Sequence, residues 1–193
     1  MTSTRLDALL GRRHSTKAFS PDSLDADVLF SLLSTVFGTG AQGRRTYGSA
    51  LARYAVTASI IVGDVSGMTP GAYDVDGDAL ARRDAEDHRA ALAAVTLDAP
   101  WLAECPALIV LTVDLATENE AFAAQGPTRG ERFAAMEAGM IAQTVHLVAE
   151  SLGIGTALIA GLDHPGAHDV AASALPTGHT LLGIMPLGYP WAR

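Results

Sequence analysis

One short N-terminal run, RRHSTK, concentrates side chains that could bind an anion. In a chain with a net charge of −8, it places Arg12, Arg13 and Lys17 within six residues, with His14 and Ser15 between them. A guanidinium binds phosphate oxygens through paired hydrogen bonds, and hydroxyl and imidazole groups add donors with little bulk. The run therefore predicts a phosphate site. The alternative, which composition alone favours, is a solvated helix end whose arginines face the negative end of the helix dipole.

The other residues with reactive side chains give weaker signals. The single cysteine, Cys105, excludes an internal disulfide and a multi-cysteine metal site, and its place before an apolar run predicts a buried structural thiol. His164 and His168 have the spacing of two helical metal ligands, but Pro165 and Gly166 follow the first histidine and no third ligand is evident. We therefore predict no metal.

Composition predicts one domain, residues 1–193, in a cytoplasmic enzyme. The chain is 49% hydrophobic and 18% charged, which favours a large core or an additional buried interface such as that of a dimer. The N-terminus lacks the apolar core of a signal peptide, and no run reaches the roughly 20 apolar residues of a membrane span. An acidic chain repels phosphate backbones, so we expect neither a nucleic-acid partner nor a membrane partner.

The elements that must position the basic run alternate between helix and strand. Periodicity and turn signals predict a long helix over Arg129–Leu152 that ends at Gly153, and a second helix capped by Asp22 or Ser23. Further helices are expected near residues 6–10, 84–95 and 166–174, strands near 54–63, 105–116 and 179–190, and a hairpin over 67–80. The mixed order predicts an α+β domain with helices around one sheet.

Several of these segments resemble one flavoprotein superfamily. RHSTKAF resembles the N-terminal FMN-binding motif of the bacterial oxygen-insensitive nitroreductases. RRTYGSALARYAVTASIIVG is similar to the RPYPSAGALYPLEVYVVVG pattern of the SagB-type dehydrogenases in the same superfamily, and GMTPGAYDVDGDAL to their GLPPGLYRYDPEGHAL. The segment from residue 129 to residue 163 and the closing MPLGYP also resemble that branch. The resemblance therefore covers nearly the whole chain in order.

The resemblance implies a nitroreductase-like α+β fold, in which a mainly antiparallel sheet is surrounded by helices. It also implies an intertwined homodimer with two FMN sites at the interface. The residues that it assigns to FMN include the basic run, in which Arg13, His14 and Ser15 would meet the phosphate and ribityl chain, with Arg12 beside them, and Lys17 would meet the pyrimidine edge. The resemblance assigns three further groups to FMN. Gly48, Ser49 and Ala50 would reach the flavin from the partner subunit, and Ala160 and Gly161 would face its hydride-accepting nitrogen. Arg193 would take the place of a basic tail.

The implied chemistry is ping-pong hydride transfer from NAD(P)H through FMN to a nitroaromatic, quinone or similar small acceptor, with no side chain acting as catalytic acid or base. One alternative is a SagB-type dehydrogenase that oxidises a modified peptide or azoline. However, the Lys-Tyr pair of azoline-oxidising members falls on Gln125-Gly126, and GSALARYA lacks both prolines and a glycine of PSAGALYP. A second alternative is a flavin-binding protein without a dedicated substrate.

Overall fold

The centre of the fold is a five-stranded sheet in the order β5-β4-β2-β6-β7, with every neighbouring pair antiparallel. The computed structural model describes residues 5–162 and 173–191. The sheet strands are β2 (Thr57–Val62), β4 (Gly71–Asp76), β5 (Ala79–Asp84), β6 (Ala107–Val113) and β7 (Thr180–Leu187). Two short strands, β1 (Leu24–Asp25) and β3 (Val65–Ser66), form a separate parallel pair.

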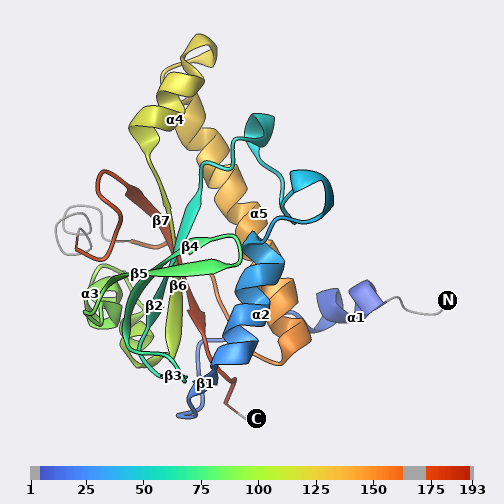
Figure 1. Ribbon diagram of the computed structural model, residues 1–193, viewed down its shortest axis with the longest axis vertical. Helices are drawn as coiled ribbons and strands as arrows, with labels where there is room; N and C mark the ends of the chain where they lie inside the picture. Colours follow the sequence, from blue (N-terminus) through green and yellow to red (C-terminus); the bar gives the residue numbers. More distant parts are fainter. Residues whose placement is uncertain (1–4, 163–172, 192–193) are drawn as a thin grey trace.

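The sheet is covered on both faces, so the fold has three layers (Figure 1). All seven residues of β6 are buried. Because successive side chains of a strand point to opposite faces, Ile109 and Leu111 join one hydrophobic cluster, whereas Leu108 and Val110 join the other. Burial on both sides explains why β6 is a continuous apolar run rather than an alternating one.

Helices α2 (Ala26–Phe37) and α5 (Arg129–Leu152) pack on one face, and α3 (Arg89–Ala94) with the 3₁₀ turn η3 (Pro100–Glu104) packs on the other (Figure 1). The short helix α1 (Arg5–Arg12) buries no residue and lies beside the C-terminal end of α5, while α4 (Leu115–Ala121) lies beside its N-terminal end. The remaining 3₁₀ turns are η1 (Ala41–Gly43), η2 (Ala50–Ala52) and η4 (Ala123–Gln125). No described helix is long and apolar enough to cross a membrane.

The α+β class, the helix over Arg129–Leu152 and its end at Gly153, which is left-handed with φ +75°, are confirmed. The predicted cap of the second helix is wrong. Asp25 caps α2 by accepting the N–H of Asp27, while the Ser23 hydroxyl donates to Asp64 instead.

Other boundaries also differ from expectation. The helix predicted over 84–95 begins only at Arg89, because β5 extends to Asp84. The sequence did not predict α4, whose N-cap residue Asp114 comes directly after the last residue of β6. Most of the helix expected over 166–174 lies outside the described residues.

Candidate functional site

Thr16 anchors the basic run to the loop that follows α5. Its N–H donates to the Thr156 carbonyl over 2.9 Å, and its side chain is buried. A Cβ on Gly155 would lie 2.6 Å from the Thr16 methyl group, so only glycine permits this approach. Because side chains of an extended segment alternate in direction, the buried Thr16 turns Ser15 and Lys17 outward, and both are exposed.

The other side of the basic run pairs with the C-terminal segment. Trp191 donates its N–H to the Ala18 carbonyl over 3.1 Å, and Ser20 donates to the Tyr189 carbonyl over 2.8 Å. Phe19 and Pro190 form an isolated antiparallel bridge. The basic run is therefore fixed between the end of α5 and the end of the chain, although Arg193 itself lies outside the described residues.

The structure distinguishes among the cations of this run. Arg12 donates to Glu150 on α5 over 2.9 Å. Among the described residues, no ion pair involves Arg13 or Lys17. His14 Nδ1 lies 3.0 Å from the Arg12 carbonyl, so Nδ1 carries a hydrogen, since a carbonyl oxygen can only accept. Arg13 and Lys17 are therefore the cations available to a ligand.

His146 on α5 lies near the same cations. The residue is buried, and this burial lowers the pKa of His146, with the positive charges of Arg13 and His14 lowering it further. A neutral histidine adds no competing charge here. Because the charges of Arg13 and His14 affect the pKa of His146, both residues lie near this turn of α5.

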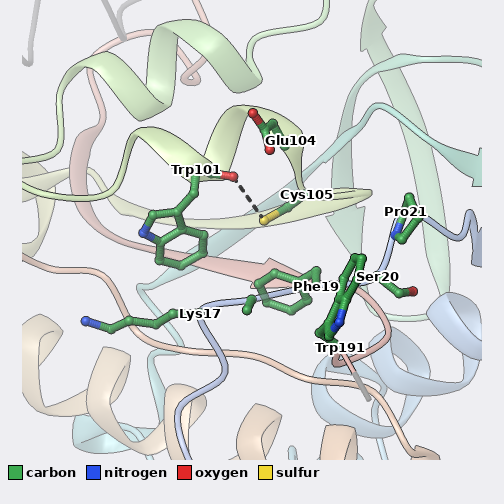
Figure 2. A pocket seen from close by; sticks show the side chains of 9 residues that line it. Lys17, Phe19, Ser20, Pro21, Trp101, Glu104, Cys105 and Trp191 are labelled. Carbon is green, nitrogen blue, oxygen red and sulfur yellow. Dashed lines mark hydrogen bonds between the residues drawn. The ribbon is translucent and has the colours of Figure 1, made fainter. Parts of the chain in front are cut away.

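Two adjoining hollows flank the basic run. One measures about 290 Å³ and the other about 400 Å³, and Lys17, Ala18 and Trp191 line both. The smaller hollow also includes His14, Ser15, Thr16 and Pro190. Figure 2 shows the larger one, with Trp101 and Phe19 near Lys17 and Trp191 on the far side of Phe19. The rings of Phe19 and Trp101 stack with centroids 6.1 Å apart. Together the hollows reach the size of a small-molecule site, typically about 300–1,000 Å³.

Sequence reasoning missed the aromatic part of this site. Trp101 comes from η3 and Trp191 from the chain end, and neither belongs to the basic motif. Cys105 lines the larger hollow but is almost fully buried, and this burial raises the pKa of its thiol to about 12. The prediction of a buried structural thiol is confirmed. The feature of the sequence that could have pointed to Trp101 is its position just before a predicted buried strand.

The second predicted group, Gly48, Ser49 and Ala50, lies elsewhere in the chain. A Cβ on Gly48 would contact Met140 on α5, and Ser49 lies close enough to Glu137 on the same helix to lower the pKa of its carboxyl. Glu137 and His146 are nine residues apart, which corresponds to about 13 Å along a helix. Figure 1 likewise places η2 beside the middle of α5 and the basic run near its C-terminal end. Within one chain, these two groups are not brought together.

The third predicted group, Ala160 and Gly161, is exposed on the stretch that continues from Thr156. Ile159 pairs with Ile184 of β7, and the Gly161 carbonyl accepts the Leu97 N–H over 3.0 Å. Hydrogen bonds on both sides therefore fix the backbone at Ala160. The same stretch holds the basic run through Thr156. The basic run and the Ala160–Gly161 pair are therefore both positioned by the segment that follows α5.

Two further predictions concern other parts of the surface. Gln125 and Gly126 line a hollow of about 270 Å³ at the start of α5, with Pro127, Thr128, Arg129 and Arg132. No lysine or tyrosine lines this hollow. His164 and His168 lie outside the described residues, and the described part of the chain contains no cluster that could hold a metal ion.

Comparison with known proteins relates this chain to the nitroreductases. The sequence model described as the nitroreductase family matches residues 10–189. A Methanocaldococcus jannaschii protein named as a nitroreductase is 28% identical over 155 residues, covering 79% of this chain and 76% of that protein.

Two solved structures share the fold. A protein of Anabaena variabilis described as a nitroreductase superimposes with a TM-score of 0.79 at 24% identity, and the match covers 96% of this chain but only 38% of that one. A chain of the E. coli microcin synthetase McbBCD complex, solved with truncated pro-MccB17 bound, gives a TM-score of 0.74 at 18% identity, covering 100% of this chain and 75% of that one.

Proposed function

Since the chain belongs to the nitroreductase family, and is therefore an oxidoreductase of a family that generally uses flavin, we propose that it is an FMN-dependent reductase of small organic acceptors. The donor would be NADH or NADPH, and the acceptor a nitroaromatic, a quinone or a similar compound. The observation that carries the proposal is the pair of hollows along the basic run, both lined by Lys17 and one of them also by His14 and Ser15. We take residues 1–193 as one FMN-binding domain.

The donor set fits FMN. A phosphate dianion requires several convergent hydrogen-bond donors, and Arg13, His14 and Ser15 offer a guanidinium, an imidazole and a hydroxyl on consecutive residues. Lys17 extends the positive charge toward the aromatic hollow, where a cation favours the negative charge of reduced flavin. Ala160, Gly161 and Arg193 stay predictions as further contacts.

Bound FMN would supply hydride transfer in two half-reactions at one face. The protein itself would bind, orient and shield the reactants, and no ionisable side chain needs to transfer a proton. Protons for a reduced nitro group or quinone can come from water, which fits a site whose assigned residues include no acid–base pair.

We also propose that the working unit is a homodimer. Gly48–Ala50 and the basic run are separated along α5 in a single chain, so one site that contains both groups requires a second copy. Exposed apolar side chains lie near the Gly48–Ala50 segment, with Leu51 81% exposed, Met136 51% and Met140 40%. Contiguous exposed apolar surface of this kind is typical of an interaction site.

Purified protein tests the proposal directly. It should be yellow, and acid should release FMN rather than FAD. Anaerobic NADH or NADPH should bleach the flavin, and a benzoquinone should restore its colour. A colourless protein that does not bind added FMN would refute the proposal.

The SagB-type alternative is supported by the segment resemblances and by the shared fold with a chain of the microcin synthetase complex. Azoline oxidation removes a carbon-bound proton, and a positioned base typically contributes about 10²- to 10⁴-fold to such a step. Neither Gln125 nor Gly126 can serve as that base. We therefore expect quinone or nitroaromatic turnover and little thiazoline oxidation from one FMN-loaded preparation.

The opposite pattern, rapid thiazole formation without quinone turnover, would favour the SagB-type alternative. FMN binding without NAD(P)H oxidation would favour a flavin-binding protein that has no dedicated substrate. A cytoplasmic location stays a prediction.

A further inference from the structure

Glu137 is a buried carboxylate without a cationic partner. It lies in the interior of α5 with 2% of its surface exposed, and among the described residues no ion pair involves it. Burial raises the pKa of Glu137, and hydrogen bonds from Ser49 and from backbone N–H groups act in the opposite direction. A buried carboxylate is costly unless such hydrogen bonds compensate for its lost hydration. The groups that the Glu137 carboxylate contacts therefore indicate its role.

The donor groups beside the Glu137 carboxylate in the described chain lie in the loop over residues 48–56. Glu137 Oε1 accepts the Val56 N–H over 3.1 Å. The Ser49 hydroxyl and the Ala55 N–H also lie close enough to the carboxylate to lower its pKa. Ser49 Oγ in turn accepts the Tyr54 N–H over 2.7 Å. One side chain of α5 thus bonds directly to the Val56 end of the loop over residues 48–56 and lies beside Ser49 near its other end.

This loop has an unfavourable backbone conformation. Leu51, Ala52 and Tyr54 have φ values of +52°, +55° and +52°, in the left-handed region that non-glycine residues rarely adopt. Each such residue is strained, because its Cβ crowds the following carbonyl oxygen. The side chain of Leu51 at the tip is exposed, so its burial within this chain does not compensate for the strain.

We propose that Glu137 is a positioning residue that holds the loop over residues 48–56 in this strained form, so that Gly48–Ala50 is presented to the flavin site of a second copy. The inference rests on the proposed function, because the presented segment is the one assigned to the partner's FMN. The hydrogen bond from the Val56 N–H to this carboxylate, with Ser49 and Ala55 beside it, favours the strained form of the loop. A preformed loop avoids the entropy cost of ordering when the flavin binds.

The decisive variant is Glu137→Gln. It keeps the size of the side chain but replaces one acceptor oxygen with an NH₂ group, which faces hydrogen-bond donors and repels them. Glu131→Gln is the matched control, because Glu131 is an exposed glutamate on the same helix.

Hydrogen exchange of the flavin-free protein should report faster exchange in Glu137→Gln, by about tenfold or more, confined to peptides that cover residues 47–58. The Kd for FMN should rise by about tenfold, the equivalent of one charged hydrogen bond. The visible circular dichroism of bound FMN should also change, because the surroundings of the ring change. Glu131→Gln should match the wild type in all three measurements.

Unchanged loop exchange in Glu137→Gln would overturn the inference. Faster exchange with an unchanged Kd and unchanged flavin dichroism would also overturn it, because Glu137 would then support only the fold. If Glu137→Gln does not fold, the flavin-free Ser49→Ala variant provides the test. Its hydrogen exchange should be faster at residues 54–56, and unchanged exchange there would overturn the inference. Failure of the wild type to bind FMN would instead refute the proposed function, a separate outcome.

Discussion

Arg13 is the side chain on which the phosphate assignment depends most. It is half-buried, lies near His146 and has no ion-pair partner among the described residues, whereas neighbouring Arg12 is paired with Glu150. A cation that is held in place without an anionic partner is ready to bind one. Arg13 therefore offers the most direct test at the residue scale.

Replacing Arg13 with alanine should weaken FMN binding by about 1.5–3 kcal/mol, the contribution of a hydrogen bond to a charged group. Fluorescence titration of the flavin-free protein measures the loss. Arg5→Ala, an exposed arginine at the start of α1, serves as the control and should leave the affinity unchanged. Equal affinities for Arg13→Ala and the wild type would place the phosphate elsewhere.

His146 predicts a specific dependence of stability on pH. Its folded-state pKa lies below the ordinary value of 6.5, so the unfolded chain binds more protons in the window below pH 6.5. The free energy of unfolding should therefore fall as the pH drops from about 6.5 through the lowered pKa, and this contribution should then level off. Below that window, no further loss from this group is expected.

Urea unfolding of the flavin-free protein at several pH values tests this prediction. The difference between wild type and His146→Leu isolates the histidine from the other titrating groups. A difference that does not vary with pH between about 4.5 and 7.5 would contradict the assignment.

At the scale of elements, α5 determines the spacing of the predicted site. Its middle holds the loop over residues 48–56 through Glu137, and its C-terminal end lies beside the basic run. The left-handed residue Gly153 then turns the chain into the stretch that holds Thr16. The end of one helix therefore governs where the basic run lies.

Gly153→Ala should destabilise the fold by about 1–2 kcal/mol, because an alanine Cβ is unfavourable at φ +75°. It should also weaken FMN binding, since Ile154–Thr156 follow directly. The matched control is Gly11→Ala in α1, where a Cβ would meet no atom within 4 Å. Chemical denaturation with FMN titration measures both effects, and a Gly153→Ala protein as stable as wild type would show that the turn is not needed.

At the scale of the whole molecule, α5 and η2 expose apolar side chains that the proposed dimer would cover. Met136→Glu introduces a charge on this surface and should shift sedimentation from dimer to monomer. FMN should be lost in parallel, because the second copy supplies Gly48–Ala50 in the proposed assembly. Phe30→Glu on α2 is the control for adding a charge at an exposed apolar position. A Met136→Glu monomer that retains FMN tightly would contradict the shared site.

The sequence predicted those features that local pattern encodes. The continuous apolar run of β6 and the extended periodicity of α5 each identify an element without reference to the rest of the fold, and Gly153 marks the end of α5 because a left-handed residue favours glycine. The basic run was equally visible, because its cations stand out in an acidic chain. The predicted site residues themselves stay predictions.

Only the tertiary structure decided which distant residues meet. Phe19, Trp101 and Trp191 are far apart in sequence, yet the packing of the fold gathers them around one hollow. Glu137 looks like an ordinary helix glutamate in the sequence, yet packing buries it against a loop that donates a hydrogen bond to it. The physical reason is that burial and hydrogen bonding between distant segments depend on how the layers pack, which no local pattern of residues records.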